Sequence, residues 1–96
     1  MDKREAGKLK AEELVETLAR SRKLDAAAYR LLWWPEIPGE PAGAGRPNET
    51  TLPLRVYKGN SWRSIDFAGS DIDGSVDNPE LLNRYERELA ECLTDL

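Results

Sequence analysis

Histidine is absent from the 96 residues of the chain, and Cys92 is its single cysteine. Without an imidazole the chain cannot build a Ser-His-Asp triad, a Cys-His dyad or a histidine-bearing zinc site. One cysteine cannot form an internal disulfide or a cysteine-rich metal cage. We therefore expect a protein that is not an enzyme and that uses no cofactor and no metal.

Long apolar runs are also missing, since none approaches the roughly 20 residues that a membrane span needs. Residues 1–5 are charged, and no apolar segment follows them, so we expect no secretory signal. The length fits one domain, residues 1–96. The sequence therefore predicts a single domain in the cytoplasm, with no membrane partner.

Acidic residues outnumber basic ones, 18 to 14, and the excess is concentrated near the C-terminus. Residues 66–96 carry nine acidic residues against Arg84 and Arg87, a net charge of −7. Such a field repels nucleic acid and attracts basic protein surfaces. Solubility is the alternative explanation, because small domains commonly carry a net charge of this size.

Two helices are predicted in the N-terminal third. Over residues 2–22, alanine, leucine and valine recur at helical spacing, with acids in the first turn and bases at the end. Over residues 25–34, Asp25 is a suitable N-cap, three alanines follow it, and Pro35 ends the segment. A strand over residues 29–34 is the alternative, because tyrosine and tryptophan favour strands.

Residues 35–50 are predicted to form a flexible loop, because four prolines alternate there with three glycines. Residues 51–67 then predict a β-hairpin that turns at Gly59-Asn60. Pro53 favours the edge of a sheet for the first strand. This register gives the hairpin one apolar face, which must pack on the helices: Leu52, Leu54, Val56, Ile65 and Phe67.

Residues 78–95 predict an amphipathic helix with Asn78 as its N-cap. Cys92 lies on the apolar stripe and is interpreted as a small buried hydrophobe. The opposite face pairs charges four residues apart: Glu80 with Arg84, Arg84 with Glu88, and Arg87 with Glu91. The resulting order is helix, helix, loop, hairpin and helix, which predicts a small α+β domain with the helices on one side of the hairpin.

The segment from Asp71 to Glu80 has part of the spacing of an EF-hand calcium loop. Asp71, Asp73, Asp77 and Glu80 fall at its positions 3, 5, 9 and 12. The first ligand position is occupied by Gly69, however, and the preceding segment is predicted as a strand. A turn followed by a helix cap explains the same residues. We predict no metal site here, and a calcium-responsive module is the minor interpretation.

Aromatic and acidic side chains are the candidate binding residues. Trp33 and Trp34 are adjacent, so one helix cannot bury both. Tyr57 and Trp62 lie on the hairpin face away from the predicted core, near arginines, a composition typical of protein-binding hot spots. The alternative is a second small core beneath the Pro-rich loop. The candidate partner-binding residues are Trp34, Tyr57, Trp62, Asp66, Asp71, Asp73, Asp77, Glu88 and Glu91.

These features predict a non-enzymatic inhibitor that binds another protein and occludes a basic surface, such as that of a nuclease or a nucleic-acid-binding complex. In size and charge the chain resembles phage-encoded inhibitors of bacterial defence such as anti-CRISPR proteins, DNA mimics, and immunity proteins that neutralise nuclease toxins. The alternative is a small DNA-binding or transcriptional adaptor that uses residues 1–34, although the negative charge disfavours direct nucleic-acid binding. Homodimer formation stays open.

Overall fold

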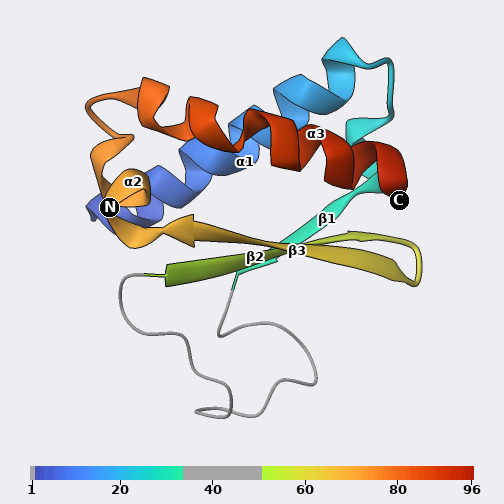
Figure 1. The fold of residues 1–96 in the computed structure, drawn as a ribbon, viewed down its shortest axis with the longest axis horizontal. Helices are drawn as coiled ribbons and strands as arrows, with labels where there is room; N and C mark the ends of the chain where they lie inside the picture. Colours follow the sequence, from blue (N-terminus) through green and yellow to red (C-terminus); the bar gives the residue numbers. More distant parts are fainter. Residues whose placement is uncertain (1, 34–50) are drawn as a thin grey trace, which may run out of the picture.

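The computed structural model describes residues 2–33 and 51–96 (Figure 1). Trp34 and the predicted loop at 35–50 lie outside the described residues. The elements in chain order are α1 (Lys3–Ser21), the 3₁₀ helix η1 (Ala26–Ala28), β1 (Arg30–Trp33), β2 (Thr51–Lys58), β3 (Ser61–Ala68), α2 (Gly69–Gly74), the 3₁₀ helix η2 (Pro79–Tyr85) and α3 (Glu86–Asp95). The predicted α+β class is confirmed.

The three strands form one antiparallel sheet in the order β1-β2-β3. The predicted hairpin is confirmed in its register, with Tyr57 opposite Trp62 and Leu54 opposite Ile65. The turn uses Gly59 in the left-handed region, at φ 61°, which glycine adopts without steric cost. The predicted apolar face is buried along its whole length.

The helix predicted over residues 25–34 is wrong for its described part. Asp25 caps only the single turn η1, where its side chain accepts a hydrogen bond from the Ala27 N–H. The chain then extends as β1, which pairs with β2 from Arg30 to Trp33. Pairing with β2 and the burial of Trp33 outweigh the helix preference of three alanines. Residues 25–33 therefore contain no helix long enough to serve as a recognition helix.

The edge position expected for the first hairpin strand is also wrong, because β2 is the central strand. The described pairing of β1 with β2 ends at Leu54. Pro53, which has no N–H to donate, lies one residue beyond that pairing. On the other side of β2, Pro53 lies opposite Asp66 of β3.

Helix α1 agrees with the prediction to within one residue at each end. Asp2 is its N-cap and accepts a hydrogen bond from the Glu5 N–H at 2.8 Å. The side of α1 that faces the interior carries small residues, including Gly7 and Ala11. A Cβ at Gly7 would lie 1.9 Å from the carbonyl oxygen of Ile72, so the glycine allows α1 to cross α2 at very close range.

The C-terminal helix is shorter than predicted, because residues 79–85 form the 3₁₀ helix η2 and α-helical geometry begins at Glu86. The side chain of Asn78 makes no capping hydrogen bond. Helix α2 was not predicted at all. Cys92 is buried, as expected from its position on the apolar stripe.

The helices cover one face of the sheet (Figure 1). The core lies between these layers and includes Leu54, Phe67, Ile72 and Leu89. Alternation along the strands places Tyr57 and Trp62 on the opposite face. Among the described residues no helix covers that second face of the sheet, which is called the open sheet face below.

Candidate partner-binding surfaces

Arginine and aromatic side chains gather on the open sheet face. The guanidinium of Arg55 lies 3.8 Å from the ring centroid of Trp62, and that of Arg30 lies 4.8 Å from the ring of Tyr57. Arg55 also donates a hydrogen bond from Nη1 to the Tyr57 hydroxyl at 3.3 Å. Trp62 is 48% exposed. Neighbouring strands thus hold these rings against cationic planes, an arrangement that favours stacking.

The open sheet face is not acidic over its described part. Arg30 and Arg55 lie on it, and Asp66, from the far end of β3, is the acidic candidate on the same side. Tyr57, Trp62 and Asp66 therefore share one face, as the hairpin register predicted. The other acidic candidates belong to the helical layer, on the opposite side of the sheet.

Asp71 has a structural role. It is only 7% exposed, and its Oδ2 accepts hydrogen bonds from the Tyr85 hydroxyl at 2.6 Å and from Arg84 Nη1 at 3.2 Å. The Tyr85 hydroxyl in turn accepts a hydrogen bond from the Ala68 N–H at 2.9 Å. Burial, followed by the bond to Asp71, raises the pKa of Tyr85. This network joins β3, α2 and η2, so Asp71 is not an accessible binding residue.

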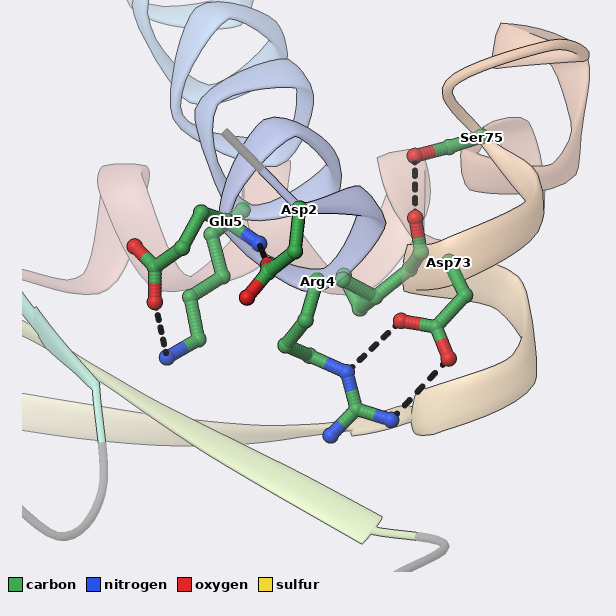
Figure 2. A network of polar contacts seen from close by, with 7 residues as sticks. Asp2, Arg4, Glu5, Asp73 and Ser75 are labelled. Carbon is green, nitrogen blue, oxygen red and sulfur yellow. Dashed lines mark hydrogen bonds and ion pairs between the residues drawn. The ribbon is translucent and has the colours of Figure 1, made fainter.

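Asp73 and Asp77 bind the beginning of α1. Arg4 donates from Nε to Asp73 Oδ1 at 2.7 Å and from Nη2 to Oδ2 at 3.1 Å (Figure 2). This hydrogen bonding lowers the pKa of Asp73. Asp77 is exposed and lies 3.5 Å from Lys3 Nζ. Both carboxylates thus take part in ion pairs that hold α2 and the following turn against α1.

The calcium-loop spacing is not realised as a loop, because residues 69–74 are helical. The carboxylates of Asp71, Asp73 and Asp77 contact three different cations, on η2 and on α1. In residues 2–33 and 51–96, no group of three acidic or cysteine side chains converges on a possible metal position.

The outer side of η2 and α3 carries exposed carboxylates, and its charge pairing differs from the prediction. Arg87 pairs with Glu91 at 3.3 Å, as expected. Arg84 turns instead to Asp71, so it pairs with neither Glu80 nor Glu88. Glu80 and Glu88 are exposed and form no ion pair within the described chain. Because Arg84 pairs with the buried carboxylate of Asp71, the surface carboxylates of Glu80 and Glu88 are left without a cationic partner.

A groove between α1 and β1 was missed in the sequence. It has a volume of about 700 Å³ and is lined by both elements and by the connection between them. The strand alternative for residues 29–34 was the signal that could have revealed it, because a strand there becomes the outer edge of the sheet.

Comparison with known proteins adds no assignment: no protein-family model, no curated protein and no solved structure matches this chain. Within the described residues, none of the helices combines the length and the apolar character needed to cross a membrane. The functional argument therefore rests on the surfaces described above.

Proposed function

We propose that this protein is a non-enzymatic, cytoplasmic inhibitor that binds a partner protein and covers its basic surface. The contact would be made by Glu80, Glu88 and Glu91 on the outer side of η2 and α3, named here the acidic helix face. The observation that carries the proposal is the engagement of Arg84 by buried Asp71, which leaves Glu80 and Glu88 without their neighbouring cation. Exposed, uncompensated carboxylates steer basic partners and oppose association with acidic ones.

The class of partner is inferred from the negative charge of the acidic helix face. A protein surface that holds nucleic acid presents lysine and arginine to phosphates, and it is the natural complement of a row of carboxylates. Covering it would block nucleic-acid binding, which is the mode of inhibition expected from the resemblance in size and charge to DNA mimics. Tyr57, Trp62 and Asp66 lie on the other side of the sheet, so we leave them out of this contact.

The test uses a tagged full-length chain to capture partners from lysate of the native host at low and at high salt, with mass spectrometry as the readout. We expect a nucleic-acid-binding protein or nuclease at low salt and its loss at high salt. The captured partner is then titrated with the Glu80→Gln/Glu88→Gln variant. We expect its association rate to fall about threefold to tenfold, since charges of this kind act mainly on association.

The matched control is Glu5→Gln/Glu13→Gln, which changes net charge equally but on exposed positions of α1. It should leave the association rate within about twofold of the wild-type value, because α1 lies outside the contact. Equal effects of the two variants would assign the attraction to net charge alone and reject the acidic helix face.

A further inference from the structure

The open sheet face is organised in rows that run across the three strands. Arg30, Tyr57 and Trp62 are register partners and form one row, and Arg55 lies opposite Ser64 in the next row. Neighbouring strands lie about 4.8 Å apart, so the first row spans about 10 Å from the arginine to the tryptophan. Two or three side chains of a partner can contact a row of this length.

Two guanidinium groups lie close to the tyrosine ring of this row. Those of Arg30 and Arg55 lie 4.8 Å and 5.9 Å from the ring centroid of Tyr57. Within the described chain Arg30 forms no ion pair. A guanidinium stacked on a ring keeps the N–H groups at its edge, which bind a carboxylate in a bidentate manner. A carboxylate bound there by Arg30 would also be attracted by the charge of Arg55.

The hairpin end of the open sheet face is locally positive. Among the described residues, Asp66 is the carboxylate on this face, and it lies opposite Pro53. It is four residues from Trp62, which is about 13 Å along an extended strand. The two rows with the arginines therefore contain two positive charges and no carboxylate from the described chain, although the whole protein has a net charge of −4.

Trp62 supplies the apolar part of this surface. It is 48% exposed, and the guanidinium of Arg55 lies 3.8 Å from its ring centroid. This contact restrains the indole, so less side-chain freedom is lost when a partner packs against it. Tryptophan, tyrosine and arginine are also the side chains that contribute most to binding energy at protein interfaces.

We propose that the open sheet face binds an acidic segment of a partner protein. A carboxylate of that segment pairs with Arg30 near the charge of Arg55, and a neighbouring apolar side chain packs on Trp62. This contact goes beyond the proposed function, because the acidic helix face belongs to the helical layer on the opposite side of the sheet (Figure 1). The protein can thus hold a basic partner on its helices and an acidic one on its sheet.

Single-stranded nucleic acid would use similar chemistry, with bases on the rings and phosphates at the arginines. Its affinity, however, comes from many phosphate contacts, and the described part of this face offers two arginines on a chain of net charge −4. A peptide segment with few carboxylates is repelled less by the overall charge, while the nearby arginines attract it equally. These charges therefore favour an acidic peptide segment.

The probe is the peptide acetyl-Glu-Glu-Phe-Glu-Glu-amide, titrated into the ¹⁵N-labelled full chain and followed by nuclear magnetic resonance. We expect shifts of the Trp62 indole N–H and of the amides of residues 55–57 and 62–64. The peptide with glutamine in place of all four glutamates should bind at least about tenfold more weakly, because it forms no charge-assisted hydrogen bonds. The peptide with glycine in place of phenylalanine should bind at least about fivefold more weakly, because it leaves Trp62 uncovered.

Two variant pairs locate the contact. Arg30→Gln should weaken peptide binding about fivefold. Arg63→Gln removes the same charge beside Trp62, but its side chain points to the helices and pairs with Asp95, so binding should stay within about 1.5-fold of wild type. Trp62→Ala should weaken binding at least about tenfold, whereas Leu9→Ala, at an equally exposed apolar side chain of α1, should leave it unchanged.

Any of four results would overturn the proposal. The first is the absence of shifts at millimolar peptide, and the second is equal binding of the glutamine peptide, which would remove the charge argument. The third is tighter binding of a ten-nucleotide thymidine oligomer at the same residues, which would make single-stranded nucleic acid the occupant. The fourth is a dimer in sedimentation without peptide, with concentration-dependent shifts at Trp62, which would make a second copy of the chain the occupant.

Discussion

Gly7→Ala is the substitution that most directly tests how α1 packs on α2. Gly7 is buried, and a Cβ at this position would lie 1.9 Å from the Ile72 carbonyl oxygen and 2.8 Å from the Ile72 Cγ2. At an exposed helical position the same change stabilises a protein by about 1 kcal/mol. Here the methyl group would occupy space already filled by backbone, so the two helices must separate.

Whether Gly7→Ala stabilises or destabilises the protein depends on whether the gain in helix propensity or the cost of overpacking is larger. Overpacking a well-packed interior costs about 1–3 kcal/mol, and a backbone carbonyl cannot rotate away as a side chain would. We therefore take the upper value, which exceeds the helix-propensity gain and leaves a net loss of about 2 kcal/mol. For a domain of this size that loss lowers Tm by about 8–16 °C.

Thermal and urea unfolding, followed by circular dichroism, measure the loss. Thr17→Ala is the matched control, since Thr17 lies on the exposed side of the same helix. It should gain a few tenths of a kcal/mol from helix propensity alone. A Gly7→Ala protein with a Tm at or above the wild-type value, beside a stabilised Thr17→Ala, would show that α1 and α2 are not in close contact.

Three further substitutions or modifications test the buried and paired groups. Tyr85→Phe should cost about 2 kcal/mol in urea unfolding, because it removes the hydroxyl that donates to Asp71 at 2.6 Å, and a loss below about 0.5 kcal/mol would contradict this. The Arg4 hydrogen bonds lower the pKa of Asp73 in the folded state, so their stabilisation is present above about pH 4 and is lost as the pH falls through the folded pKa. The Tm difference between wild type and Asp73→Asn should therefore shrink from pH 7 towards pH 3, and a constant difference would refute the pairing. Burial raises the pKa of the Cys92 thiol, so iodoacetamide should react at least about tenfold more slowly with the folded than with the unfolded chain at pH 8, and equal rates would contradict its burial.

The hairpin was predictable because its determinants are local. Gly59 favours a left-handed φ, and the two-residue turn then fixes which residues of the two strands face each other. The alternation of apolar and polar residues gives the same register independently. Helix α1 was predictable for a similar reason, since its periodicity, its N-cap Asp2 and its terminal bases all agree.

The residues before Trp34 were not predictable from local preference. Three alanines favour a helix, and η1 does form there, but it lasts one turn. What converts the next four residues to a strand is their partner β2, which lies more than 20 residues further along the chain. The sequence indicates a strand here through the strand preference of tyrosine and tryptophan, which made residues 29–34 the alternative strand, and through the alternation of Leu31 and Trp33, which face the core, with Arg30 and Leu32.

The ion-pair partner of Arg84 on the candidate surface was likewise not predictable from local sequence. Spacing alone pairs Arg84 with Glu80 or Glu88, four residues away on either side. The structure pairs it with Asp71, because a buried carboxylate without a cation costs far more than an exposed one. No local rule identifies that competition, since the burial of Asp71 depends on where α2 packs.

The resulting charge distribution predicts how binding through the acidic helix face responds to salt. Lys3, Arg4, Arg63, Arg84 and Arg87 each pair with one of the nine carboxylates of residues 66–96. Two of the four carboxylates left without an ion pair within the described chain, Glu80 and Glu88, lie on the acidic helix face. Association through that face should weaken steeply as salt screens exposed charges. A partner that is retained in high salt would therefore be held by a surface other than the acidic helix face.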